Sequence, residues 1–158
     1  MDNFWLNAAF YQASLAIGNT GKNPAVGCVI VKNNEIVGMG HTSKNGRPHA
    51  EEIALTMAGK KALGSTLYLT LEPCCLDNNN NSCTNQIINA GIRKVVIGML
   101  DYNKLTFKKG INTLTKNGLE TKLLKLDFSN FLLNYSHYCF HSLNRPMISI
   151  KLATSADS

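Results

Sequence analysis

The chain has 158 residues, of which 44% are hydrophobic, so it can bury roughly 70% of its unfolded surface in one domain and has no room for a second. Sixteen Lys and Arg against ten Asp and Glu give a net charge of +6, which favours an anionic ligand such as a phosphorylated small molecule. The apolar runs are far shorter than the ~18 to 20 residues of a membrane span, and the N-terminus lacks a secretory signal, so we expect a cytoplasmic protein without a membrane partner.

The first elements along the chain are a helix and a hairpin. Apolar residues at helical spacing predict a helix over Asn3–Ile17. Two β-branched runs, Val26–Val31 and Glu35–Gly40, flank the pair Asn33-Asn34, which tolerates positive φ. These runs predict two antiparallel strands joined by a tight turn.

Beyond the hairpin, patterns typical of helices and strands alternate. Strands are expected at Thr66–Leu71, Lys94–Gly98 and Glu120–Leu124, and helices at His49–Lys60, Thr84–Ala90, Gly110–Asn117 and Ser129–Leu143. An extended run, Met147–Leu152, follows the last helix. This alternation predicts a mixed or largely parallel sheet with helices on both faces.

The cysteines point to a local metal site. Three of the five, Cys74, Cys75 and Cys83, lie within ten residues, which favours a metal site over a disulfide framework. With His49, the pair Cys74 and Cys83 offers one imidazole and two thiolates, a zinc set with an open fourth position that is typical of catalysis. Cys75 is not needed for such a site. The alternative is a core histidine with inert buried thiols.

Glu51 is the natural proton shuttle beside this set. Positions two apart differ by about 200° on a helix, so His49 and Glu51 cannot share a face in mid-helix and are expected in its first turn. Cys83 also precedes a predicted helix, whose N-terminal dipole favours a thiolate. The alternative for Glu51 is a solvated helix residue, which is what we expect of its neighbour Glu52.

The spacing of these residues resembles the H-x-E and P-C signature of the zinc-dependent deaminases. Here eight residues separate the two cysteines. This longer spacing, with the segments Lys22–Val31, Gly46–Glu51, Thr70–Cys75 and Ala90–Ile92, closely resembles the deaminase domain of the bacterial riboflavin-biosynthesis deaminase/reductase. The resemblance covers nearly the whole chain. It implies a cytidine deaminase-like three-layer α/β/α sandwich with a mixed five-stranded sheet.

The resemblance also implies a reaction and its catalytic residues. The reaction is the zinc-dependent hydrolytic deamination of 2,5-diamino-6-ribosylamino-4(3H)-pyrimidinone 5′-phosphate to 5-amino-6-ribosylaminouracil 5′-phosphate and ammonia, in riboflavin biosynthesis. His49, Cys74 and Cys83 would hold zinc, and Glu51 would move protons. A phosphorylated substrate agrees with the positive net charge. The family further implies a homo-oligomer, a dimer or larger.

Four residues are expected to bind substrate, Asn23, Ala50, Arg47 and Asp101, and the resemblance supports Asn23 and Asp101 among them. Asn23 would contact the pyrimidine ring, or otherwise shapes the turn before Pro24. Asp101 follows a strand end and would contact ribose or phosphate, or otherwise caps its loop. Arg47 would contact phosphate, or otherwise is a solvated charge. In the last helix, His137 and His141 have helical spacing, but we expect no metal there because no third ligand is near in sequence.

Two further regions can be compared with the family: the end of the chain and the loop between the two cysteines. The run from Pro146 resembles the opening strand of the family's reductase domain. We therefore expect a deaminase domain over 1–145, then a linker and the start of a truncated reductase-like segment over 146–158, with a reductase in cis or in trans. Between the cysteines the family usually carries a His-His-Gly-Arg-Thr-Pro type loop, where this chain has Leu76–Ser82. We expect this exchange to weaken phosphate binding and to spare the metal site.

Two other functions stay open at this point. The first is a deaminase for another base, nucleotide or tRNA adenosine. The second is a catalytically silent, zinc-folded scaffold, which the intact Glu51 argues against and the exchanged loop argues for. Nucleic acid is not an expected partner, since the aromatic residues follow no stacking pattern.

Overall fold

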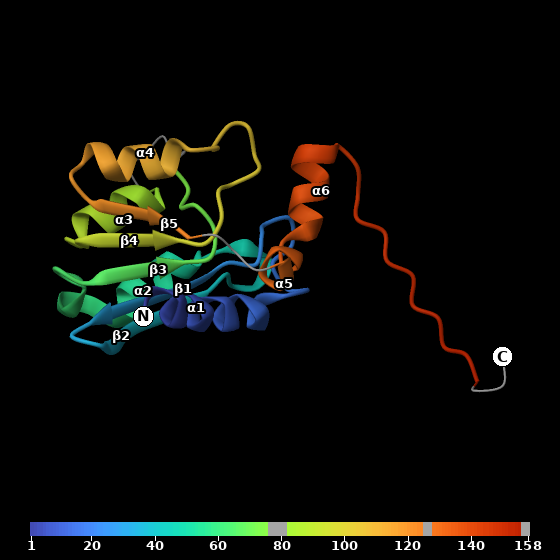
Figure 1. Ribbon diagram of the computed structural model, residues 1–158, viewed down its shortest axis with the longest axis horizontal. Coiled ribbons are helices and arrows are strands. Elements are labelled where there is room, and N and C mark those ends of the chain that lie inside the picture. Colours follow the sequence, from blue (N-terminus) through green and yellow to red (C-terminus); the bar gives the residue numbers. More distant parts are fainter. Residues whose placement is uncertain (76–81, 125–127, 156–158) are drawn as a thin grey trace.

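The computed structural model describes residues 1–75, 82–124 and 128–155, and within them the strands form one five-stranded sheet (Figure 1). The strand order is β2-β1-β3-β4-β5. The strands are β1 (Gly27–Lys32), β2 (Glu35–His41), β3 (Thr66–Leu69), β4 (Lys94–Ile97) and β5 (Glu120–Leu123). β1 pairs antiparallel with β2 and β3, whereas β3, β4 and β5 are parallel, so the predicted mixed sheet is confirmed.

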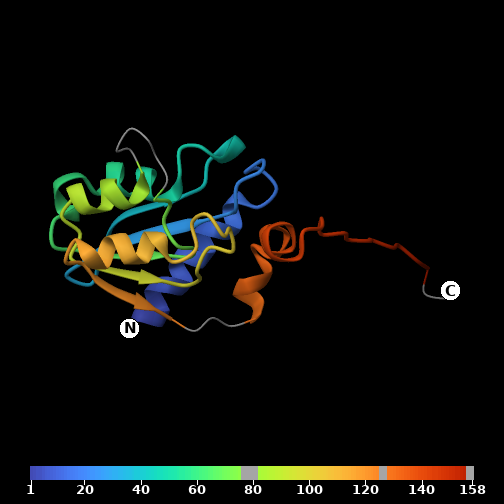
Figure 2. The same cartoon turned by 90° about the horizontal axis from the view of Figure 1, so that it is seen from above.

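Helices cover both faces of the sheet, as predicted. They are α1 (Asp2–Ala16), α2 (Ala50–Ala58), α3 (Cys83–Asn89), α4 (Lys109–Lys116), α5 (Phe128–Leu132) and α6 (Tyr135–Leu143), with 3-10 turns η1 (Lys44–Gly46) and η2 (Gly59–Ala62). Leu6 and Phe10 of α1 pack on one face, against Val29 and Val96. Helices α2, α3 and α4 cover the other face (Figure 2), where Ala54, Ile87 and Leu114 meet Ile30, Leu67 and Val95. The three-layer arrangement follows from the alternation of side chains along each strand.

Close packing of α1 on β1 depends on a glycine. A Cβ built on Gly27 would lie 1.9 Å from the carbonyl oxygen of Ala9 in α1. The hairpin between β1 and β2 also matches its prediction, because Asn33 and Asn34 adopt φ values of 51° and 65°. Two successive positive φ values are what a type I′ hairpin turn requires.

The last predicted helix, Ser129–Leu143, is wrong as a single element. The structure has two helices instead, α5 and α6, and Asn134 stands between them with φ −117° and ψ 24°. The Asn134 side chain is buried and bonds the backbone of Ala25: its Oδ1 accepts the Ala25 N–H at 2.9 Å, and its Nδ2 donates to the Ala25 carbonyl at 3.0 Å. A tertiary contact over 109 positions therefore sets the break, and helical periodicity does not reveal it.

The segment after α6 leaves the sheet and its helices. Residues 146–155 have no regular secondary structure, and Ile148, Ile150 and Leu152 are about 80% exposed (Figure 1). Within the described ranges, no helix combines the length and the apolar character needed to cross a membrane.

Candidate active site

Three predicted metal ligands meet at the ends of secondary-structure elements. His49 is the N-cap of α2, Cys83 is the first residue of α3, and Cys74 lies in the segment that follows β3. Their ligand atoms all lie within 4.8 Å of one another. Glu51 falls in the first turn of α2, so the prediction that His49 and Glu51 share the start of a helix is confirmed.

The distances among these atoms fit a tetrahedral zinc ion. The Nδ1 atom of His49 lies 3.2 Å from the Cys83 sulfur and 3.8 Å from the Cys74 sulfur. Ligand bonds of ~2.0 to 2.3 Å at tetrahedral angles separate neighbouring donor atoms by roughly 3.3 to 3.8 Å. One imidazole and two sulfurs are donors that zinc prefers, and three protein ligands leave a fourth position open.

The two sulfurs differ in how readily they ionise. A hydrogen bond from the Cys83 thiol lowers the pKa of Cys74 to about 4, against the effect of burial and with help from His49. The same bond raises the pKa of Cys83, and burial raises it further. The Cys83 backbone N–H also donates to the Cys74 sulfur at 3.4 Å. Cys74 is therefore ready as an anionic ligand, and metal binding must displace the thiol proton of Cys83.

Glu51 is almost completely enclosed beside these ligands. Its exposed fraction is 3%, and it lines the same cavity as His49 and Cys74. Burial raises the pKa of Glu51 to about 7, because removing a carboxylate from water disfavours its charged form. A carboxyl group that titrates near neutral pH can both accept and donate a proton during one reaction cycle.

Glu52 is not the solvated residue that its sequence context indicates. Its Oε2 accepts the His49 backbone N–H at 2.6 Å, and its Oε1 accepts a hydrogen bond from Gln86 in α3 at 3.2 Å. Arg47 pairs with the same carboxylate at 3.4 Å, although its own side chain is 57% exposed. A Glu at the third helical position that bonds the N-cap backbone fixes the helix start. Glu52 thereby holds His49 in place and ties α2 to α3.

A cavity of about 200 Å³ opens in front of Glu51. Its described lining comprises Lys22, Asn23, Pro24, Val26, Thr42, His49, Glu51, Leu71, Glu72, Cys74, Asp101, Asn103, His137 and His141. Two predicted substrate residues, Asn23 and Asp101, are in this lining, and Arg47 and Ala50 are not. Asn23 lies against Gly46, whose φ is +94° and where a Cβ would come within 1.9 Å of the Asn23 amide nitrogen.

Comparison with known protein families agrees with this arrangement of metal ligands. Residues 1–99 match the family described as the cytidine and deoxycytidylate deaminase zinc-binding region. The chain belongs to this deaminase family. Zinc is accordingly its metal cofactor, and the His49, Cys74 and Cys83 group can hold a metal ion.

Individual relatives carry names from riboflavin biosynthesis. The chain is 40% identical over 157 residues to riboflavin biosynthesis protein RibD of Aquifex aeolicus (strain VF5), a match that covers 99% of this chain and 44% of that protein. It is 45% identical over 122 residues to the diaminohydroxyphosphoribosylamino-pyrimidine deaminase of Buchnera aphidicola subsp. Schizaphis graminum (strain Sg), covering 77% of this chain and 83% of that protein. The resemblance stated from sequence is confirmed.

A solved structure gives the same result for the fold. Acinetobacter baumannii RibD, form 2, superposes with a TM-score of 0.91 at 36% identity, over 99% of this chain and 44% of that chain. The cytidine deaminase-like fold is confirmed. The chain spans about two fifths of the length of these RibD proteins.

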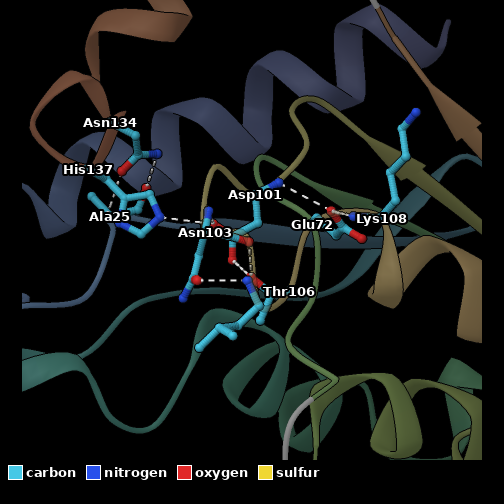
Figure 3. A network of polar contacts seen from close by, with 9 residues as sticks. Ala25, Glu72, Asp101, Asn103, Thr106, Lys108, Asn134 and His137 are labelled. Carbon is cyan, nitrogen blue, oxygen red and sulfur yellow. Dashed lines mark hydrogen bonds and ion pairs between the residues drawn. The ribbon is translucent and has the colours of Figure 1, made fainter. Parts of the chain in front are cut away.

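The deaminase pocket contains functional side chains that sequence reasoning missed. Glu72, part of the Glu-Pro-Cys motif, is 5% exposed, and its carboxylate accepts the backbone N–H groups of Asp101, Lys108 and Ile111 at 3.0 to 3.2 Å. It thus ties the segment leading to Cys74 to the loop that carries Asp101 (Figure 3). The sequence does contain one indication of this role, because Glu72 is a charged residue between Leu71 and Pro73. A carboxylate that is buried in such surroundings needs hydrogen-bond partners.

His137 was also missed as a pocket residue. Sequence reasoning considered His137 and His141 only as metal ligands, and in the structure both line the cavity of the deaminase. His137 contacts Asp101, which is 36 positions away along the chain. No local pattern indicates this pairing.

The remaining expectations concern cysteines and one loop. Cys28 is fully buried in the core, and Cys75 is outside the group of potential ligands. Residues 76–81 of the exchanged loop lie outside the described residues. Ser82, which ends that loop, is the N-cap of α3 and accepts the Asn85 backbone N–H.

Proposed function

We propose that this chain catalyses the hydrolytic deamination of 2,5-diamino-6-ribosylamino-4(3H)-pyrimidinone 5′-phosphate, giving 5-amino-6-ribosylaminouracil 5′-phosphate and ammonia. The observation that carries the proposal is the enclosed Glu51 carboxyl in one cavity with His49 and Cys74, which form a potential metal-ligand group with Cys83. The printed names of the Aquifex and Buchnera relatives support the substrate class and the place in riboflavin biosynthesis.

In this proposal His49, Cys74 and Cys83 are the zinc ligands. They fit the ion in donor type and in spacing. When bound, zinc supplies the Lewis acidity that brings the pKa of a water molecule to ~7 and so provides a nucleophile at neutral pH. His49 stands at the start of α2 and Cys83 at the start of α3, where the helix dipole favours the negative charge of a thiolate.

Glu51 moves the protons in this reaction. Its carboxylate accepts a proton as water oxygen bonds to the ring carbon that carries the amino group. It returns this proton to the ring nitrogen, then takes the proton of the newly formed hydroxyl group and passes it to the leaving amine as the carbon–nitrogen bond breaks. Ammonia departs and a carbonyl remains on the ring. Because burial holds the pKa of Glu51 at about 7, both directions of transfer are accessible at neutral pH.

Substrate contacts are assigned to the other side chains of the cavity. Asn23 and Asp101 both line it, which supports roles for them with the pyrimidine ring and with the ribosyl phosphate. Arg47 and Ala50 stay predictions, since neither lines the cavity. Ala50 is fully buried.

Domain organisation and assembly are part of the same proposal. We infer that residues 1–145 form the deaminase unit and that the segment from Pro146 is the junction to a reductase-like segment, with the reductase in cis or in trans. The name of a Thermotoga maritima homologue, a deaminase and uracil reductase, supports this inference. We also infer a homo-oligomer, which light scattering of the purified protein would test.

The experiment that tests the function is ammonia release by protein of known zinc content. The panel comprises the diaminopyrimidine ribotide, its unphosphorylated form, cytidine, dCMP and a tRNA with adenosine in the anticodon. We expect turnover of the ribotide well above that of every other compound. Preference for another compound would assign the chain to a different deaminase. Zinc-loaded protein that deaminates none of them would support the silent scaffold.

A further inference from the structure

The Asp101 carboxylate is held by several donors. It lies between β4 and α4, in a stretch without regular secondary structure. The Asn103 backbone N–H donates to Oδ1 at 3.0 Å, and the Thr106 hydroxyl donates to Oδ2. His137 Nε2 lies 2.9 Å from Oδ1, and this is the contact to a distant element (Figure 3). Asp101 and His137 are only 15% and 10% exposed.

The direction of the His137 hydrogen bond follows from the ionisation of Asp101. Burial raises the pKa of this carboxyl, but the hydrogen bonds from His137, Thr106 and Asn103 outweigh burial and leave the pKa below its usual value. An ionised carboxylate only accepts hydrogen bonds. His137 therefore donates through its Nε2–H, and such charge-assisted bonds are among the stronger ones in proteins.

Helix α6 is fixed so that His137 reaches Asp101. Asn134 anchors the start of the helix to the backbone of Ala25, next to Pro24 in the cavity wall. His137 follows three positions later, which places it on nearly the same side of the helix. Figure 3 shows the bonds between Asn134 and Ala25 close to the contact between His137 and Asp101.

The loop and α6 are also joined by aromatic contacts that do not involve His137. The ring of Tyr102 packs edge-on against Tyr138, with centroids 4.8 Å apart, and against Phe131 at 6.1 Å. Tyr135 and Tyr138 stack on each other at 5.8 Å. These contacts keep α6 beside the loop when the imidazole is removed, so the hydrogen bond to Asp101 has a role separable from folding.

We propose that His137 is a positioning residue for substrate binding, which holds the Asp101 carboxylate in its place in the wall of the active-site cavity. This inference rests on the proposed function. With the imidazole bond in place, the remaining acceptor position of Oδ2 stays available to the substrate. Without it, Asp101 can rotate toward another donor or toward water, and the substrate must reorder it on binding.

Kinetics of five forms of the zinc-loaded protein test the inference: wild type, His137→Leu, His137→Gln, Asp101→Ala, and the double variant His137→Leu with Asp101→Ala. Leucine removes the donor and keeps the bulk, and glutamine places an amide N–H where Nε2 stands. We expect His137→Leu to raise KM for the ribotide about tenfold, with kcat changed less than about threefold. His137→Gln should restore KM to within about threefold of wild type.

The double variant separates positioning from a general structural role. In the Asp101→Ala background, His137→Leu should raise KM less than about twofold further, because its partner is already absent. Ser142→Ala, an exposed substitution on the same helix, is the control for α6. If His137→Leu is too unstable to purify, His137→Asn, whose amide is too short to reach Asp101, replaces it.

The possible results distinguish failure of this inference from failure of the proposed function. Unchanged KM in His137→Leu, equal impairment of His137→Gln, or full additivity with Asp101→Ala would overturn the inference while the proposed function stands. Wild-type protein with one zinc per chain and no ammonia release from the ribotide would overturn the proposed function, and the inference with it. Zinc content and unfolding temperature are measured for every form, and a fall in either for His137→Gln contradicts a pure positioning role.

Discussion

The wall of the cavity that carries His49 and Glu51 lies at the start of α2, beside Cys83 at the start of α3, whereas the wall that carries Asp101 and His137 joins a loop to a distant helix. In the first wall, α2 and α3 pack on the sheet through fully buried residues such as Ala54 and Ile87. In the second, positions depend on individual hydrogen bonds and on a small aromatic cluster.

The difference bears on how the two walls contribute to catalysis. Reacting groups need fixed geometry, because a misplacement of about 1 Å can cost about 100-fold in rate. Helix starts packed on a sheet supply that rigidity. A wall held by few bonds can be changed by single substitutions while the chemistry survives. Substitutions in the first wall should therefore affect metal content and kcat, and those in the second should affect KM and local stability.

The largest effect is expected from removal of both sulfur ligands. Cys74→Ser together with Cys83→Ser should reduce bound zinc from one per chain to near zero, and ammonia release should disappear with it. Elemental mass spectrometry after dialysis measures the metal. Cys75→Ser is the matched control and should keep its zinc, because Cys75 is outside the ligand group. Full zinc content in the double variant would disprove the ligand assignment.

The second largest effect is expected from Glu51→Gln, which removes the proposed proton shuttle. Glu51→Gln should lower kcat by about 10⁴-fold, since the amide neither accepts nor returns a proton and general acid–base catalysis contributes ~10² to 10⁴ per role. Zinc content should stay at the wild-type level. Glu52→Gln is the neighbouring control, because its amide oxygen still accepts the His49 backbone N–H, and its rate should fall only a few-fold. Near wild-type turnover of Glu51→Gln would remove Glu51 from the mechanism.

The second wall is probed by Asn134→Ala. This substitution leaves the buried N–H and carbonyl of Ala25 without a partner, which should lower the free energy of unfolding by about 2 to 4 kcal/mol. Urea denaturation measures the change, with Ser142→Ala as the control on the same helix. Zinc content should not change, because the ligands belong to the other wall. Zinc loss in Asn134→Ala would show that the two walls are not independent.

The smallest effect is expected far from both walls, at the N-terminus of α1. A hydrogen bond from Lys122 lowers the pKa of Asp2, with further contributions from Tyr68 and Lys94 against burial. A carboxyl with a lowered pKa in the folded state stabilises the protein above its ordinary pKa near 3.8, and this contribution is lost as the pH falls through the lowered value.

Asp2→Asn should therefore destabilise the protein by about 1 kcal/mol or less at pH 7, with screening by solvent included. The difference from wild type should shrink as the pH falls below the ordinary pKa of 3.8 and vanish below the lowered pKa of Asp2. Unfolding curves at several pH values measure it, and kcat for the ribotide should not change. A constant difference at all pH values would exclude the ionised carboxylate as the cause.

The sequence by itself determined the alternation of strands and helices, the hairpin at Asn33-Asn34, and the group His49, Glu51, Cys74 and Cys83. Each depends on patterns within a few residues: side-chain periodicity, positive φ at asparagine, and ligands at helix starts next to strand ends. Such local patterns keep their meaning without knowledge of the rest of the chain. This is why the potential metal ligands and the neighbouring Glu51 were predicted as a unit.

Only the tertiary structure decided the division of the last helix at Asn134, the hydrogen bond of Glu52 with Gln86, and the pairing of His137 with Asp101. In each case a polar side chain finds a partner on another element, over 109, 34 and 36 positions respectively. Helical periodicity is the same whether such a side chain meets water or a buried backbone group. The partner of the side chain is decided by the free-energy cost of leaving a buried group without a hydrogen bond. This cost arises only in the folded protein, where the sheet has brought the elements together.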